Sequence, residues 1–294
     1  MLRKRMLTTV AIQRTLAKAR TKFDLKIRHR DRLHPAKLAK YVAERAASNA
    51  VAPWAGSDTT IAIVIPCYGH ARFVPRALES IAHQTVQPNQ IIAIDDHSPD
   101  STYQVLQDSA LSLGLDATKV TTGRNPANLG QCATLNRAIG HAKTDLIMIL
   151  NDDDYLMHDA VERAIEVFRA FPHIALLGTQ AVYVYGEGYL DNHKKRVADA
   201  LITGQLEIGV RYPADVLKYR TARDLDMCHS GSTFRKQAWA AVGGYWPRKG
   251  DRLVLFSDRD FQLRVNALFP VAIVRNAAFA FWRIDSSVDE GLFT

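Results

Sequence analysis

The chain of 294 residues lacks the long apolar runs and the cysteine pattern that would place it in a membrane or an oxidising compartment. No stretch of 18 apolar residues occurs, so the sequence predicts no transmembrane helix. Cys67, Cys132 and Cys228 are widely spaced and form no zinc motif, and their odd number leaves at least one thiol free. The basic N-terminus is followed by a segment too polar for a signal peptide. We expect a cytoplasmic protein.

Two glycine-based nucleotide motifs are also missing. The turn after the first predicted strand reads PCYGHARF and lacks the G-x-G-x-x-G pattern of a dinucleotide-binding dehydrogenase. The sequence contains no G-x-x-x-x-G-K-[ST] loop, which a P-loop phosphotransferase requires. Both of these enzyme classes are therefore discounted.

Apolar runs alternate with amphipathic segments in the first half of the chain. With 47% hydrophobic residues, the chain can bury a full α/β core. Strands are predicted within 59–69, 91–94 and 146–150 and near Val120, and helices within 71–86, 102–113 and 132–142. This order predicts an α/β fold with a doubly wound, mostly parallel sheet flanked by helices.

Carboxylates follow two of the predicted strands. Asp95 and Asp96 end the strand 91–94, and the run NDDD at 151–154 follows the strand 146–150. In open α/β sheets, ligands bind at the carboxyl ends of the strands. Adjacent carboxylates repel one another, and a divalent cation is one reason to keep them together. A solvated acidic loop or an acidic helix start is the alternative.

Four segments in succession resemble one enzyme family. They are IVIPCYGHARFVPRALESIAHQT, IIAIDDHSPDST, NPANLGQCATLNRAI and LIMILNDDDYLMHDAV. Together they are similar to the nucleotide-binding half of the family 2 inverting glycosyltransferases, which have the GT-A fold and use nucleotide sugars. Two later segments, SGSTFRKQAWAAVGGYW and FSDRDFQLRV, resemble that family's acceptor-side segment and catalytic helix. The resemblance implies three parts: a basic helical extension (1–55), a GT-A domain (59–285) and a tail (286–294).

The resemblance implies which residues contact the nucleotide and the metal. Pro66, Cys67 and Tyr68 match the wall beside the base, Asp96 matches the acid that binds it, and Asp95 orients Asp96. Asn128 and Gly130 match an Asn-x-Gly element beside the nucleotide. Both Asp95 and Asp96 could instead simply cap the turn, and 128–130 could be a plain turn. The nucleotide is expected to be UDP.

In the acidic run, the family pattern is Asp-x-Asp-Asp, and Asn151 replaces its first acid. Asp153 falls on the metal-ligand position, Asp154 follows it as a second metal candidate, and Asp152 occupies the variable position on the nucleotide side. The expected cofactor is Mn²⁺ or Mg²⁺, because oxygen ligands suit both.

The catalytic base implied by the resemblance is Asp258, with Asp260 as the rival. Residues two apart on a helix do not share a face, so one of them is expected to reach the cleft. The alternative is that both acids complement the helix dipole. Ser232, Arg235, Trp282 and Arg283 are candidates for contacts with acceptor or phosphate, although Arg235 could be a solvated cation and Trp282 a core residue. No Gln-x-x-Arg-Trp segment of the processive synthases is present, which favours transfer of one or few sugars.

Positive charge is concentrated at the N-terminus. Residues 1–50 contain 14 Lys and Arg against 3 Asp and Glu, although the net charge of the whole chain is only +8. Ile12, Leu16, Ala19, Phe23 and Ile27 recur at helical spacing among basic residues. Such a helix can lie on an anionic membrane surface, so residues 1–30 are a candidate for peripheral membrane contact. Docking on the domain and an oligomer contact are the alternatives, and no nucleic-acid module is recognised.

Two other functions fit part of this pattern. A nucleotidyltransferase also pairs acids with a metal and a nucleotide, but it would not need the acidic helix at Asp258. A non-catalytic sugar-nucleotide-binding module would be expected to have lost the metal acid or the base, and both are present. The sequence therefore favours a glycosyltransferase acting on a glycan or lipid-linked acceptor.

Overall fold

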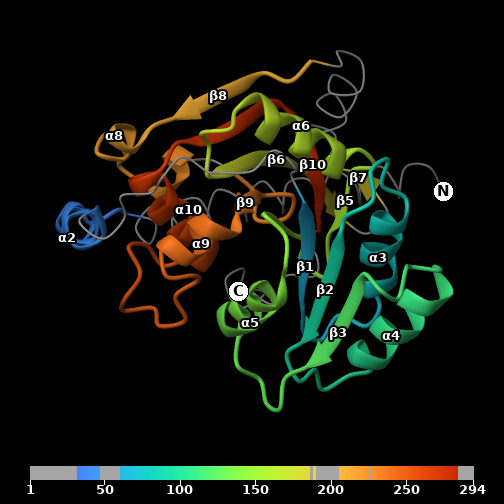
Figure 1. The fold of residues 1–294 in the computed structure, drawn as a ribbon. Helices are drawn as coiled ribbons and strands as arrows, with labels where there is room; N and C mark the ends of the chain where they lie inside the picture. Colours follow the sequence, from blue (N-terminus) through green and yellow to red (C-terminus); the bar gives the residue numbers. More distant parts are fainter. Residues whose placement is uncertain (1–31, 47–59, 186–187, 190–204, 226, 284–294) are drawn as a thin grey trace, which may run out of the picture.

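The computed structural model describes residues 32–46, 60–185, 188–189, 205–225 and 227–283. These residues form a mixed sheet with helices on both faces (Figure 1). The strands lie in the order β3-β2-β1-β4-β9-β6-β10-β5, with β7 beside β6 and β8 beside β10. The α/β class predicted from the sequence is confirmed.

The first half of the sheet follows the predicted alternation. Its elements are β1 (Ile61–Cys67), α3 (Val74–Ala82), β2 (Gln90–Asp95), α4 (Thr102–Ser112), β3 (Val120–Arg124), α5 (Gln131–His141) and β4 (Leu146–Ile149). β1 is parallel to both β2 and β4. The chain therefore winds outward from one side of β1 and returns to its other side, which creates a topological switch point at the ends of β1 and β4.

The second half departs from an all-parallel pattern. It comprises β5 (Tyr155–Leu156), α6 (Ala160–Ala170), β6 (Leu176–Tyr185), β7 (Gly188–Tyr189), β8 (Ile208–Arg211), α8 (Pro213–Val216), the 3-10 helix η1 (Ala222–Leu225), β9 (Thr233–Arg235), α9 (Lys236–Ala241), α10 (Ser257–Leu268) and β10 (Val271–Arg283). β6 and β10 are parallel, but β9 runs antiparallel to β4 and β6, and β5 and β8 run antiparallel to β10. The sheet is thus mostly parallel in its first half and mixed in its second.

Two hydrophobic cores pack against opposite faces of the sheet. In β1, Ala62 and Val64 join one core, whereas Ile61, Ile63 and Ile65 join the other, as the alternation of side chains along a strand requires. The first core contains residues of α2, α5, α9 and α10, and the second contains residues of α3, α4 and α6. Because both faces are covered, the central strands read as continuous apolar runs.

The described part of the N-terminal extension packs against the first core. α2 (Pro35–Ala46) buries Leu38 and Tyr41 in the first core. The Tyr41 ring meets Trp246 edge-on, with centroids 5.8 Å apart. The predicted amphipathic segment 12–27 and the tail 286–294 lie outside the described residues. Among the helices that the structure describes, none combines the length and hydrophobicity needed to span a bilayer.

Candidate active site

The exits of β1 and β4 meet at the switch point. Their parallel pairing ends at Val64 and Ile149, and Leu150 N donates to Val64 O over 3.0 Å. The chain then turns through 151–154, which places the predicted acidic run beside the exit of β1. Its three carboxylates nevertheless take three different positions.

Asp152 connects the two strand exits. Its Oδ2 accepts a hydrogen bond from Tyr68 N at 2.9 Å, and its Oδ1 accepts one from His70 Nδ1 at 2.8 Å. Burial raises the pKa of Asp152 to about 6, and the hydrogen bond from His70 limits the rise. The Asp152 carboxylate therefore fixes the chain that follows β1.

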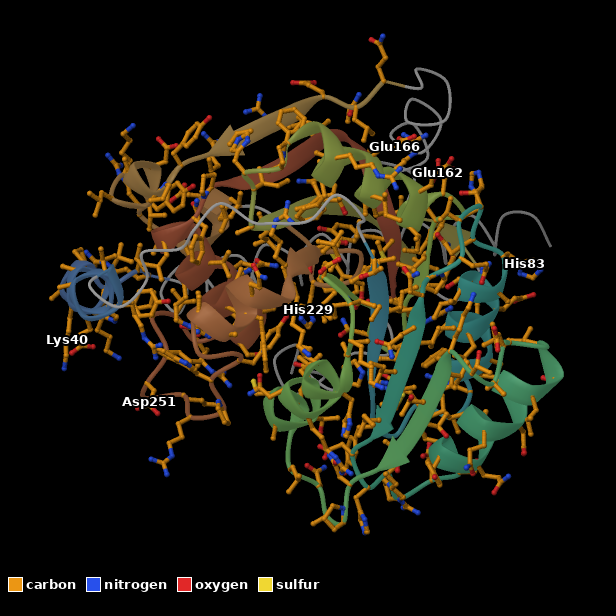
Figure 2. The ribbon with its side chains drawn as sticks, viewed as in Figure 1. Lys40, His83, Glu162, Glu166, His229 and Asp251 are labelled. Atoms are coloured by element: carbon orange, nitrogen blue, oxygen red, sulfur yellow. The ribbon has the colours of Figure 1, made fainter. Side chains whose placement is uncertain are left out.

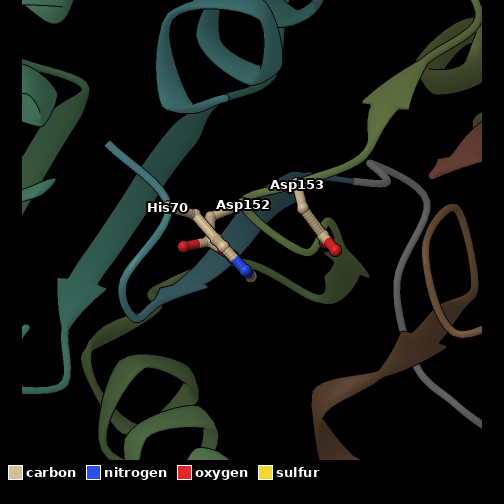
Figure 3. A group of neighbouring side chains, drawn as sticks. All are labelled: His70, Asp152 and Asp153. Atoms are coloured by element: carbon tan, nitrogen blue, oxygen red, sulfur yellow. The ribbon is translucent and has the colours of Figure 1, made fainter. Parts of the chain in front are cut away.

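His70, Asp152 and Asp153 are neighbours at the ends of β1 and β4 (Figure 3). Each offers one ligand atom, and these atoms lie within 4.8 Å of one another. Asp152 is buried, whereas His70 and Asp153 are half-buried and lie at the mouth of the group. The sequence reasoning overlooked His70, and the only signal for it was its place just after the exit of β1.

Asp154 points away from this group. It is 1% exposed and accepts hydrogen bonds from the Ser230 hydroxyl, from Arg283 N at 2.8 Å and from Asn151 Nδ2 at 3.3 Å. Burial, with the charge of Asp153, raises the pKa of Asp154 well above its usual range. Asp154 therefore links the 151–154 turn to the end of β10. It does not belong to the group of possible metal ligands, contrary to the sequence prediction.

The acids at the end of β2 hold the neighbouring loop. Asp95 is fully buried and pairs with Arg124 Nε at 3.0 Å. Asp96 accepts hydrogen bonds from Asn125 Nδ2 at 2.7 Å and from Leu129 N and Gly130 N, each at 2.8 Å. An ionised carboxylate has about four acceptor sites, so these donors leave Asp96 about one for a ligand.

The predicted nucleotide wall is exposed at only one of its three residues. Pro66 and Cys67 are buried within β1, and burial raises the pKa of the Cys67 thiol. Tyr68 is 37% exposed, and Leu129, on the loop held by Asp96, is 48% exposed. Gly130 adopts a φ of 83° at the start of α5, and Gly130 N also lies 3.1 Å from Asn128 Oδ1.

His229 joins the acidic turn to the acceptor-side segment. Figure 2 places it near the centre of the molecule, between β1 and α9. Its Nδ1 lies 3.2 Å from Asn151 Oδ1, and its Nε2 lies 3.1 Å from the Tyr245 hydroxyl. Burial lowers the pKa of His229, and the negative charge of Asp258 opposes that shift. Asp258 is half-buried at the start of α10.

Three further residues were predicted to contact the acceptor or a phosphate, and each has its own contacts. The Ser232 hydroxyl is buried and donates to His229 O. Trp282 is half-buried and meets Tyr183 edge-on at 5.0 Å. The guanidinium of Arg283 lies over the Phe73 ring at 4.6 Å, and that ring meets His70 edge-on at 5.8 Å. These contacts place Arg283 near His70.

Two predicted residues lie elsewhere. Arg235 pairs with Leu146 at the start of β4, opposite the acidic turn, and its guanidinium donates to Ile174 O and Pro172 O. Asp260 is fully buried and bonds Arg264 Nε at 2.8 Å and Leu253 N at 2.6 Å. The polar atoms of both side chains bond to other groups of the protein, so both have a structural role in this arrangement.

The guanidinium of Arg264, in turn, connects α10 to the glycine turn at 243–244. It donates to Val242 O at 2.7 Å and to Gly244 O at 2.8 Å, and it lies 4.0 Å from the Trp246 ring centroid. Arg264 is itself fully buried. The glycine turn at 243–244 is thereby fastened to α10.

A family model described as glycosyl transferase family 2 matches residues 62–241, which include β1, the acidic turn and α9. The chain belongs to glycosyl transferase family 2. The resemblance noted in the sequence is thus confirmed at the level of the family.

Relatives of this family 2 protein are considerably longer or only partly matched. The chain is 30% identical over 114 residues to an uncharacterized glycosyltransferase of Haemophilus influenzae, covering 39% of this chain and 36% of that protein. It is 23% identical over 193 residues to a chondroitin synthase of Escherichia coli, covering 63% of this chain and 24% of that protein. The chain therefore spans well under two thirds of the length of these relatives.

Solved structures share the fold of this family 2 protein. S. aureus TarS 1–349 in complex with UDP superposes with a TM-score of 0.57 at 16% identity, covering 77% of this chain and 61% of that one. A mannosyltransferase from Pyrobaculum calidifontis in complex with GDP-Man and Mn²⁺ gives 0.55 at 17% identity, covering 84% and 64%. At these identities the likeness concerns the fold.

The donor set at the switch point fits a divalent cation. Two carboxylates and an imidazole offer oxygen and nitrogen atoms, which suit Mn²⁺ and related ions. Asp152 is buried and held in place by Tyr68 N, so one ligand would be fixed before a cation arrives. The half-buried Asp153 would then meet it from the open side.

Proposed function

We propose that this family 2 protein is an inverting glycosyltransferase, which moves a sugar from a nucleoside diphosphate to a hydroxyl of a glycan or lipid-linked acceptor. One observation carries the proposal. The group formed by His70, Asp152 and Asp153 lies at the switch point of a sheet in a family 2 domain. This is the place where a diphosphate and a divalent cation would be expected to bind.

The donor would bind across the exits of β1 and β2. Tyr68 and Leu129 offer exposed apolar surface for the base, and the loop held by Asp96 brings Gly130 N to the start of α5. A helix N-terminus favours a phosphate group. We favour UDP because the TarS complexes contain UDP and UDP-GlcNAc. The mannosyltransferase complex contains GDP-Man, so GDP is tested as the second nucleotide.

A divalent cation would be held by Asp153 and Asp152, with His70 as the third group. When bound, such a cation stabilises the charge that develops on the leaving diphosphate. The protein's own contribution is to hold these side chains in position. Asp152 does so through its two hydrogen bonds to the segment after β1.

Asp258 would accept the proton of the acceptor hydroxyl. It is half-buried at the first turn of α10, and its charge reaches His229 and Tyr245. Direct attack of that hydroxyl on the anomeric carbon would invert the configuration, as in other single displacements. Asp260 is a weaker choice because Arg264 and Leu253 N occupy its carboxylate.

Calorimetric titration of UDP, GDP and dTDP, with and without Mn²⁺, tests the donor site. We expect one nucleotide to bind in a metal-dependent manner and Asp153→Ala to abolish that dependence. Asp108→Ala, which removes an exposed acid on α4, is the matched control and should bind as the unaltered protein does.

Two results would count against the proposal. Absence of nucleotide binding under every condition would point to a non-catalytic module. Release of pyrophosphate from a nucleoside triphosphate, without release of a nucleoside diphosphate from any nucleotide sugar, would point to a nucleotidyltransferase.

A further inference from the structure

Three segments far apart in the sequence form one edge of the molecule. They are 32–46, which contains α2, 211–221, which contains α8, and the loop 247–252 (Figure 1). Arg32 forms a bridge with Thr221, and Leu33 N donates to Arg220 O. Lys37 Nζ donates to Gly250 O at 3.0 Å. We call this surface the basic edge.

The charge of the basic edge is strongly positive. Its three segments contain ten Lys and Arg residues against Glu44, Asp215 and Asp251. Two of these acids already contact a lysine of the edge, Glu44 with Lys40 at 3.7 Å and Asp215 with Lys218 at 3.1 Å. The side chains of Lys40 and Lys218 are 75% and 77% exposed. Five further cations of the edge are also exposed, so most of its positive charge faces solvent: Arg32, Lys37, Arg220, Arg248 and Lys249.

Apolar side chains protrude among these cations. Leu217 is 74% exposed and Tyr212 is 52% exposed, and both belong to the segment around α8. Lys218 directly follows Leu217, and Arg211 directly precedes Tyr212. A polyanion in water would need only the cations. Apolar groups flanked by Lys and Arg instead suit the boundary between lipid headgroups and acyl chains.

We infer that the basic edge docks on the surface of a bilayer that contains anionic phospholipid. Lys and Arg near such a surface are attracted to the lipid headgroups, and Leu217 and Tyr212 enter the boundary region. Residues 1–31, which lie outside the described residues, contain ten Lys and Arg against two Asp. The docking does not depend on the proposed reaction.

Flotation of the full chain with vesicles tests this inference. We expect binding to vesicles of phosphatidylcholine mixed with phosphatidylglycerol and little binding to phosphatidylcholine alone. Replacing Lys40, Lys218 and Lys249 together by Glu should weaken binding about tenfold or more, because each cation contributes separately. The control replaces Lys119, Lys143 and Arg169 by Glu, which changes the charge equally on other exposed surfaces, and should weaken binding much less.

The contribution of apolar side chains to vesicle binding is tested by a matched pair of leucine variants. Leu217→Ser should weaken vesicle binding severalfold, whereas Leu111→Ser should leave it unchanged, although Leu111 is 77% exposed on α4. Equal effects of the two triple variants would overturn the inference, because charge alone or residues 1–31 would then account for binding. Equal effects of the two leucine variants would overturn it in favour of a soluble polyanion. Nucleotide titration of each variant reports separately on the donor site and on folding.

Discussion

Asp152 accepts a hydrogen bond from His70 across 2.8 Å, although the two residues are separated by 82 positions in the sequence. The other oxygen of Asp152 bonds Tyr68 N, so one buried carboxylate fixes both ends of the segment 68–70. The proposed donor site thus lies at the ends of two parallel strands, β1 and β4.

The first prediction concerns His70. His70→Ala should weaken Mn²⁺-dependent nucleotide binding about 10- to 100-fold, the usual loss when a group that orients or completes a metal site is removed. Calorimetry with and without Mn²⁺ measures the effect. His83→Ala, at the exposed end of α3, should bind normally. An unchanged metal dependence in His70→Ala would remove His70 from the site.

The second prediction separates chemistry from binding. Asp258→Asn should lower the turnover of the donor by about 10²- to 10⁴-fold, because the amide cannot accept the acceptor proton. Release of nucleoside diphosphate, with water as acceptor, measures turnover. Nucleotide affinity should stay unchanged. Normal turnover in Asp258→Asn would show that another group is the base.

The third prediction concerns the neighbouring acid. Asp260→Ala should lower the free energy of unfolding by about 3–5 kcal/mol, because Arg264 would be left as an unpaired buried charge. Urea denaturation measures this loss. Asp251→Ala, in the exposed loop before α10, should unfold as the unaltered protein does. Full stability of Asp260→Ala together with loss of turnover would instead make Asp260 a catalytic candidate.

The fourth prediction concerns pH and His229. Burial lowers the pKa of His229 below its ordinary value of 6.5, although the charge of Asp258 opposes the shift. Below pH 6.5 the unfolded chain therefore binds more protons than the folded chain, and the free energy of unfolding falls as the pH falls. This contribution is constant above pH 6.5.

Comparison of variants isolates that contribution. Between pH 7.5 and 5.5, urea denaturation should show a smaller loss of stability for His229→Gln than for the unaltered protein. His83→Gln, which removes an exposed imidazole, should show the same loss as the unaltered protein. Equal pH dependence in all three proteins would contradict the buried, uncharged state of His229.

The fifth prediction concerns the start of α5. Gly130 has a φ of 83°, which costs a residue with a Cβ about 1–2 kcal/mol. Gly130→Ala should lose that much stability and bind nucleotide more weakly, because Gly130 N would shift relative to Asp96. Gly140→Ala, within the same helix, meets no atom within 4 Å and should gain about 0.5–1 kcal/mol. Urea denaturation of both variants decides.

Sequence reasoning found the elements whose side chains carry a strong pattern. β1, β2 and β4 are buried on both faces and read as apolar runs, and α3 presents Val74, Ala77, Leu78 and Ile81 on one face. Local periodicity is sufficient for such elements.

The antiparallel strands of the second half gave no comparable signal. β5 has two residues and β9 has three, and each exists only because β10 or β4 lies beside it. Pairing of this kind depends on residues more than 80 positions away. The sequence pattern alone therefore predicted a sheet more parallel than the one observed.

The site shows the same division. The acidic run was recognisable in the sequence, but its three consecutive carboxylates point in different directions. Their hydrogen-bond partners determine which carboxylate stays accessible to solvent. The Ser230 hydroxyl and Arg283 N donate hydrogen bonds to Asp154, and Tyr68 N donates one to Asp152. His70 carried no motif of its own. The sequence pattern located this site, but it could not show which residue there has which role.

The buried Arg264 has a consequence for how such an enzyme can diversify. Its bonds to Val242 O, Gly244 O and Asp260 connect the glycine turn to α10, so a change in one of them displaces the other. A substitution at Asp260 or in the turn 243–244 would therefore be transmitted to the first turn of α10, where Asp258 lies, so these positions can vary only together.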